Sequence, residues 1–138
     1  MKYYISRKID ATFEQAVERV KEALESEGLE VMSEISLDKK IKDKLNVKFK
    51  KYRILGVCDA SLAYRALQHE DKAGILFPCN IVIQQLHKNE IEVAAVDPMV
   101  SMKAVKNLSV AAIAAEIREK LERVISSLHT GVESYGLV

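Results

Sequence analysis

The stretch that decides the fold is ILFPCNIVIQQLHKNEIEVAAV, residues 75–96. Its two apolar arms, Ile75–Leu86 and Glu90–Val96, flank the polar triplet His87–Asn89, and this arrangement predicts a β-hairpin. In the second arm, Glu90 and Glu92 alternate with apolar residues that share the opposite face (Ile91, Val93 and Ala95). A short connection joins antiparallel strands, because parallel neighbours need a long crossover. The hairpin therefore predicts an antiparallel sheet.

Upstream of the hairpin, strand patterns alternate with helix patterns. We expect three strands there: Lys2–Ile9, Leu29–Leu37 and Val47–Cys58. Thr12 and Gln15 fit a capping box that opens a helix, and Gly28 is placed to end it. The charged connection before the third strand has room for a helical turn. A short helix is expected over Asp59–His69, with four apolar residues facing inward (Leu62, Ala63, Ala66 and Leu67).

The last helix has the clearest pattern in the chain. Its apolar residues recur at three- and four-residue steps and form one stripe (Val110, Ile113, Ala114, Ile117, Leu121, Val124, Ile125 and Leu128). Opposite charges four residues apart predict three ion pairs on the outer surface: Glu116–Lys120, Arg118–Glu122 and Glu119–Arg123. Gly131 is a suitable stop.

The order of elements indicates an α+β fold. It runs strand, helix, strand, strand, short helix, strand, strand, helix, which favours an antiparallel sheet covered on one face by two main helices and a short one. No internal repeat, linker or composition shift divides the chain. Residues 1–138 are therefore expected to form a single domain.

Composition indicates a soluble globular protein of the cytoplasm. Apolar residues make up 49% and charged residues 30% of 138 residues, and the net charge is +1. No apolar run has the roughly 20 residues of a membrane helix, and the N-terminus becomes charged too early for a signal peptide. Two cysteines cannot make a disulfide scaffold. We expect no membrane partner.

Three segments resemble the prokaryotic domain-of-unknown-function family 302. They are KYRILGVCDA (51–60), LAYRAL (62–67) and GILFPCNIVI (74–83), followed by Val96-Asp97-Pro98 and the long last helix. The family pattern runs Tyr-x-Ile-Leu-Gly-x-Cys-Asn-Pro and then Gly-x-Leu-x-Pro-Cys-Asn-x-Val-Val. The resemblance implies a curved antiparallel sheet backed by helices, as in the TATA-binding-protein repeat, and a homodimer. The name of that fold is no evidence of DNA binding, and the family has no established activity.

The chain departs from that pattern where Asp59-Ala60 replaces Asn-Pro. Asn followed by Pro is a good N-cap followed by a good first helical residue, and Asp followed by Ala preserves both roles. The motif therefore predicts a helix start, with the Asp59 carboxylate accepting an amide hydrogen, rather than a catalytic signature.

The candidate site centres on Cys58 and Cys79. Cys58 ends a strand just before a helix N-terminus, where the helix dipole lowers a thiol pKa, and Cys79 begins the next strand. A short helix between two strands returns the chain close to where it left, so we expect adjacent, unbonded cysteines. Tyr52, Arg65 and Asn80 flank them in sequence and are candidates to line a cleft. The alternative is that both cysteines are ordinary core residues.

Three functional classes follow from these residues. A small-molecule binding or sensing module is the first. A redox or metal-binding protein that uses Cys58 and Cys79 is the second, although the three histidines show no ligand spacing (His69, His87 and His129). The third is a nucleic-acid binder that uses Lys39–Arg53. Residues 38–53 carry eight cations and two acids. The same lysines also suit a solvated sheet edge. The sequence names no cofactor and leaves open whether the protein is an enzyme.

Overall fold

The sheet is the centre of the molecule. A computed structural model describes residues 2–128, and these contain one open sheet in the order β1-β5-β4-β3-β2, with every neighbouring pair antiparallel. The strands are β1 (Tyr4–Asp10), β2 (Glu30–Ser36), β3 (Tyr52–Cys58), β4 (Cys79–His87) and β5 (Glu90–Val96). The predicted hairpin is β4–β5, with Ile83 paired to Val93 and Asn89 in the left-handed region at its turn. The antiparallel sheet is confirmed.

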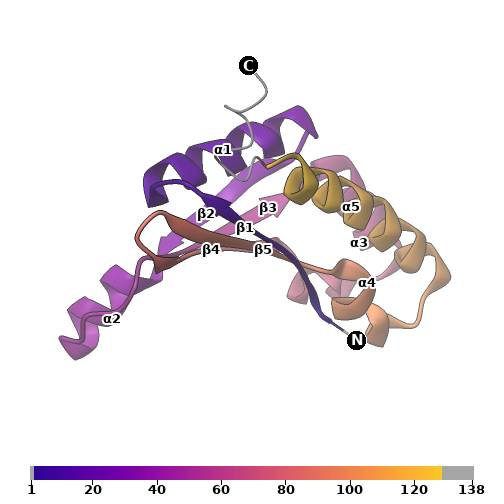
Figure 1. Cartoon of the computed structure of the whole chain (residues 1–138). Helices are drawn as coiled ribbons and strands as arrows, with labels where there is room; N and C mark the ends of the chain where they lie inside the picture. Colours follow the sequence, from indigo (N-terminus) through magenta and orange to yellow (C-terminus); the bar gives the residue numbers. More distant parts are fainter. Residues whose placement is uncertain (1, 129–138) are drawn as a thin grey trace, which may run out of the picture.

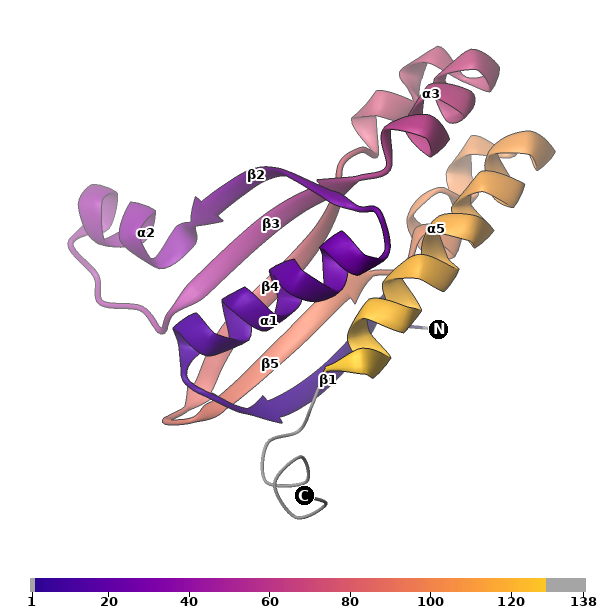
Figure 2. The same ribbon diagram turned by 90° about the horizontal axis from the view of Figure 1, so that it is seen from above.

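Five α-helices connect and cover these strands. They are α1 (Phe13–Ser26), α2 (Leu37–Leu45), α3 (Ala60–His69), α4 (Pro98–Ser101) and α5 (Leu108–Ser127). Helices α1 and α5 lie side by side on one face of the sheet (Figures 1 and 2), with α3 against α5. The α+β class is confirmed, and likeness to the TATA-binding-protein repeat stays a prediction. Among the helices described, none is long and apolar enough to cross a membrane.

The core lies between the sheet and this helical layer. Helix α1 begins with the predicted capping box, in which Thr12 and Gln15 satisfy each other's free amides. Its buried residues are Phe13, Ala16, Val17, Val20 and Leu24. Helix α5 buries the predicted stripe from Val110 to Ile125, and Leu128 caps its end. The sheet contributes alternate residues such as Leu55, Ile81, Ile83, Ile91 and Val93. The expected stop at Gly131 lies outside the described residues.

The charges on α5 pair differently from the prediction. Only Arg118–Glu122 forms as an ion pair within the helix. Glu116 contacts Arg65 of α3 and Arg123 contacts Glu27 after α1. Neighbouring elements thus bring partners that compete with those one turn away.

The boundaries of β3 and β4 also differ from the prediction. Residues 47–51 do not join β3, and Val47 and Phe49 are 49% and 43% exposed, because the chain there follows α2 away from the sheet. Residues 75–78 of the predicted strand do not join the sheet: Ile75 ends a 3-10 turn (η1, Asp71–Ile75), and β4 begins only at Cys79. In α3, Leu62 and Ala66 are buried as expected, but Leu67 is 41% exposed.

Helix α2 projects from the end of the sheet opposite α4 (Figure 1). The sequence predicts a charged connection with room for a helical turn here, and the structure has a nine-residue helix that ends at Asn46 in the left-handed conformation. None of its residues is buried. Its connection to the body includes the Asp38 carboxylate, which accepts a hydrogen bond from the Tyr52 amide at 3.2 Å.

Candidate functional site

The two cysteines meet at one end of the β3–β4 pair. Val57 of β3 pairs with Cys79, so Cys58 lies one residue beyond that pair on the neighbouring strand. Both thiols are free, as predicted. Cys79 is buried in the core and Cys58 is partly exposed. Adjacent strands and unbonded cysteines are therefore confirmed.

Their surroundings suit packing more than thiol chemistry. Both cysteines line a cavity of about 10 Å³ together with Leu29, Phe77 and Ile117, which is room for one water at most. Burial raises the pKa of Cys79 to about 12, with a further contribution from Cys58. Burial, followed by the negative charges of Asp59 and Glu30, also raises the pKa of Cys58. The lowered pKa expected beside a helix N-terminus is wrong, because these effects outweigh the helix dipole.

Asp59 caps α3 as predicted. Its Oδ1 accepts the amide hydrogen of Leu62 at 3.1 Å. Its Oδ2 lies 3.0 Å from Nζ of Lys120, which also donates to the carbonyl of Glu27. Burial alone would raise the pKa of Asp59, but these partners outweigh it and the pKa is lowered. Asp59 thus joins α3, α5 and the end of α1.

The other predicted site residues lie apart from one another. Asn80 follows Cys79 but is exposed, in register with Gly56. Tyr52 begins β3, six residues from Cys58, or about 20 Å along a strand. Arg65 lies on α3, and its guanidinium is 3.3 Å from the Glu116 carboxylate. Within residues 2–128, no three His, Cys, Asp or Glu side chains gather where they would hold a metal ion. The five residues therefore do not converge on one cavity.

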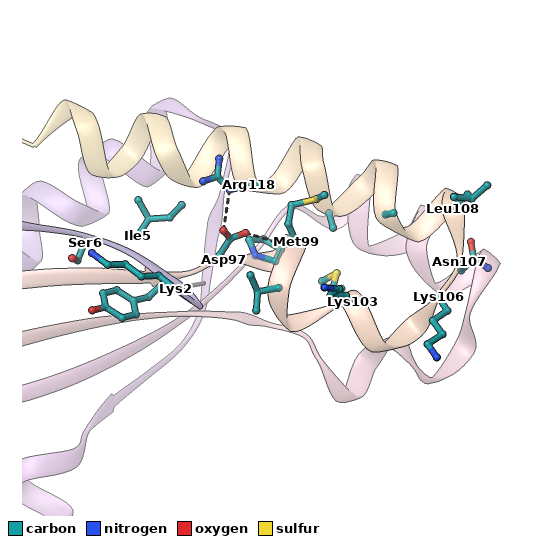
Figure 3. Close-up of a pocket in the computed structure, with 16 residues that line it drawn as sticks. Lys2, Ile5, Ser6, Asp97, Met99, Lys103, Lys106, Asn107, Leu108 and Arg118 are labelled. Carbon is teal, nitrogen blue, oxygen red and sulfur yellow. Dashed lines mark hydrogen bonds and ion pairs between the residues drawn. The ribbon is translucent and has the colours of Figure 1, made fainter.

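A large groove opens elsewhere, between β1, the start of α5 and the segment that joins β5 to α5 (Figure 3). Its volume is about 1010 Å³. The apolar lining comes from all three parts: Ile5, Pro98, Met99, Val100, Met102, Leu108, Ala111 and Ala114. Met99 is 42% and Leu108 91% exposed, so apolar surface faces the open groove.

Asp97 holds the inner end of the groove in place. It is 8% exposed, and its Oδ1 accepts the amide hydrogen of Met99, which caps α4 directly before Pro98. Its Oδ2 lies 3.0 Å from Nε of Arg118. The hydrogen bond from Arg118 to Asp97 raises the pKa of that guanidinium, and Glu122 adds to the effect. The one acid that lines the groove is thus already paired.

Three lysines line the same groove without an acidic partner within the part of the chain that the structure describes. Lys2 precedes β1, and its Nζ lies 5.7 Å from the centre of the Tyr4 ring. Lys103 and Lys106 lie on the segment before α5, where Lys106 adopts the left-handed conformation. Among residues 2–128, no carboxylate lies within ion-pair distance of these three ammonium groups. The groove combines an apolar lining with uncompensated positive charge.

Sequence reasoning missed this groove. Residues 97–108 have neither helical nor strand periodicity, and their lysines are spread among apolar residues. A signal existed in Asp97-Pro98, which is a good helix start, followed by Met99, Met102, Lys103 and Lys106. Residues 97–108 line a groove only because the fold places β1, which is distant in sequence, beside them.

The comparisons with known proteins agree with this fold. Residues 5–128 match the family model described as "Domain of unknown function DUF302". The chain is also similar to a solved structure, an uncharacterized conserved DUF302 protein from Bacillus stearothermophilus. That similarity has a TM-score of 0.84 and 23% identity, and covers 91% of this chain and 98% of the other. No protein of curated function matches the sequence. The chain belongs to the DUF302 family of domains of unknown function.

Proposed function

We propose that the protein binds a small amphipathic anion in the groove between β1, α4 and α5. The observation that carries this proposal is the pairing of an apolar lining with three lysines that have no acidic partner in the described chain. An apolar body of the ligand would contact Met99, Met102 and Leu108. Its anionic group would lie near Lys103 and Lys106, where it gains charge-assisted hydrogen bonds.

The size of the groove supports this class of ligand. Binding sites for small molecules commonly have volumes of about 300–1,000 Å³ and a mostly apolar lining with a few polar groups. The groove is at the upper end of that range, at about 1010 Å³. The Asp97–Arg118 pair also gives it a fixed inner wall, because each side chain has a second partner. A ligand thus meets a site that is largely formed beforehand.

The two alternatives have less support. A thiol site would need an accessible thiolate, whereas burial raises the pKa of both cysteines. A nucleic-acid site on Lys39–Arg53 would need stacking platforms, and this segment has only two aromatic residues, Phe49 and Tyr52, among its eight cations. A small-molecule binding module in the cytoplasm therefore remains the function that we propose.

Probes of matched chain length test the proposal. We expect dodecanoate and dodecyl phosphate to raise the thermal midpoint of unfolding, because a ligand of the folded state stabilises it. Dodecanol and dodecyltrimethylammonium keep the apolar chain but lack the negative charge, so the expected shift is smaller. Equal shifts for all four probes would contradict a role for the lysines.

Two neighbouring alanines of α5 provide a matched pair of variants. Ala111 lines the groove, whereas Ala112 is exposed and does not. Leu is nearly as good a helix former as Ala, so both Ala111→Leu and Ala112→Leu should keep the helix. We expect Ala111→Leu to weaken dodecanoate binding at least about fivefold by filling the groove, a loss of about 1 kcal/mol, and Ala112→Leu to leave it unchanged. Equal affinities in isothermal titration calorimetry would refute the assignment of the groove.

A further inference from the structure

The basic arm, defined as residues 37–51, comprises α2 and the chain that leads to β3. It carries seven lysines and two aspartates, a net charge of +5 in a protein whose total is +1. All seven lysines are exposed. The arm extends from the end of the sheet opposite α4 and the groove (Figures 1 and 2). Its surroundings therefore leave it accessible to a partner larger than a small molecule.

The arm also exposes apolar side chains among these charges. Leu45 is 68%, Val47 49% and Phe49 43% exposed, and they follow one another at alternate positions from the last residue of α2 onward. Within residues 2–128 the Phe49 ring has the Tyr52 ring beside it, at 6.2 Å between ring centres, but none of the three side chains is buried. Exposed aliphatic groups gain free energy only by leaving water, so a purely ionic partner would leave this feature unused.

A hollow of about 550 Å³ lies between α2 and the returning chain. Four lysines line it with Phe49: Lys39, Lys42, Lys48 and Lys51. Asp38 and Asp43 also contribute, and Asp38 is engaged by the Tyr52 amide. Lysine clusters of this kind bind phosphate as point charges. The hollow thus suits an anionic headgroup beside apolar side chains.

We propose that the basic arm docks on the surface of an anionic lipid bilayer, which departs from the expectation of no membrane partner that the composition of the whole chain gives. Lysines on a protruding helix are attracted to anionic lipids, and neighbouring apolar side chains insert into the boundary between headgroups and acyl chains. In the docked protein Leu45 and Val47 enter that boundary, while the lysine-lined hollow receives lipid phosphate. A nucleic acid would use the lysines but not Leu45 and Val47, so charge and apolar exposure together favour the lipid surface.

Cosedimentation with vesicles tests this docking with the full-length protein. We expect binding to phosphatidylcholine vesicles that contain phosphatidylserine, weaker binding as salt rises, and none to pure phosphatidylcholine. Lys42→Gln/Lys48→Gln should weaken the partition coefficient about 25-fold at low salt, taking about fivefold per lysine. The matched control Lys8→Gln/Lys88→Gln removes two exposed lysines outside the arm and should change it little.

The apolar contribution separates this proposal from its rivals. Leu45→Gln/Val47→Gln keeps every charge and, with circular dichroism confirming the fold, should weaken vesicle binding at least about fivefold. The arm would be assigned to nucleic acid instead if the protein bound an oligonucleotide column more tightly than it bound vesicles and if Leu45→Gln/Val47→Gln left that column retention unchanged. If light scattering showed the parent protein as a dimer and Leu45→Gln/Val47→Gln as a monomer, the basic arm would be assigned to contact with a second copy of this chain. Failure of the parent protein to sediment with phosphatidylserine vesicles also overturns the proposal.

Discussion

Replacing Asp59 tests how one side chain holds α3 to the rest of the molecule. Asp59→Ala removes two interactions: the cap on the Leu62 amide and the contact with Lys120. Loss of an N-cap costs about 1 kcal/mol. The ion pair is partly exposed, with 26% of the Lys120 side chain and 15% of the Asp59 side chain accessible, so it contributes about 0.5–1 kcal/mol. We expect a total loss of about 1.5–2 kcal/mol in the free energy of unfolding.

Asp59→Asn separates the two contributions. Asn caps a helix about as well as Asp, so this variant should lose only the ion pair, about 0.5–1 kcal/mol. Because the folded protein lowers the pKa of Asp59, the charge stabilises fully above the ordinary pKa of 3.8 and less as the pH falls through the lower folded value. The difference between the parent and Asp59→Asn should therefore be present at neutral pH and vanish in strong acid.

Urea denaturation followed by circular dichroism measures these differences at both pH values. The reasoning is refuted if Asp59→Asn costs as much as Asp59→Ala at neutral pH, because the cap would then contribute nothing. It is equally refuted if the difference between the parent and Asp59→Asn persists unchanged in strong acid. A double-mutant cycle with Lys120→Met should give a coupling of about 0.5–1 kcal/mol.

Three further predictions concern the sheet and the assembly. Gly56→Ala should destabilise the protein by about 1–3 kcal/mol, since a new Cβ would lie 2.8 Å from the ring of Pro78. Gly74→Ala is the matched control, because Gly74 has open space around it. Equal urea midpoints for the two variants would contradict the close packing at Gly56. At pH 7, Ellman's reagent should label Cys58 more slowly than free cysteine and Cys79 only on unfolding, because burial raises both pKa values; labelling of Cys79 in the folded protein at the free rate would disprove its burial. We also propose a homodimer. The sheet face away from α1 and α5 supports it, because small and aliphatic side chains form a row across the five strands there (Ser6, Ala94, Val82, Ile54 and Ile35). A monomer mass in light scattering at micromolar concentration would count against it.

Most of the fold could be predicted from the sequence, because the spacing of apolar residues in a periodic helix or strand shows which of its faces is buried. The stripe of α5, the capping box at Thr12 and the β4–β5 hairpin all depend on residues close in sequence. Helix α2 was harder to predict, since its apolar residues lie among charges and none is fully buried: Leu37 and Ile41 are half-buried and Leu45 is exposed. The groove could not be predicted, because β1 is distant in sequence from α4 and α5, which supply the rest of its lining.

The candidate site shows the same limit. Cys58 and Cys79 were correctly placed on neighbouring strands by the short helix between them. Their chemistry depends on burial, which raised the pKa of Cys58 where its position before α3 alone predicted the opposite. Arg65 was assigned to the site from nearness in sequence, and a helix points its side chain toward Glu116 instead.

The strand order also has a consequence for synthesis. Strand β1 leaves the ribosome before the other four described strands, but its only partner in the described sheet is β5, with Tyr4 opposite Val96 and Asp10 opposite Glu90. Until that distant segment emerges, β1 has no ladder to join, and the apolar face of α1 lacks the strands and the α5 helix that cover it. Nascent chains shorter than this closing pair expose that surface to chaperones and to aggregation. The hairpin β4–β5 is therefore the element whose emergence permits the N-terminal third to fold.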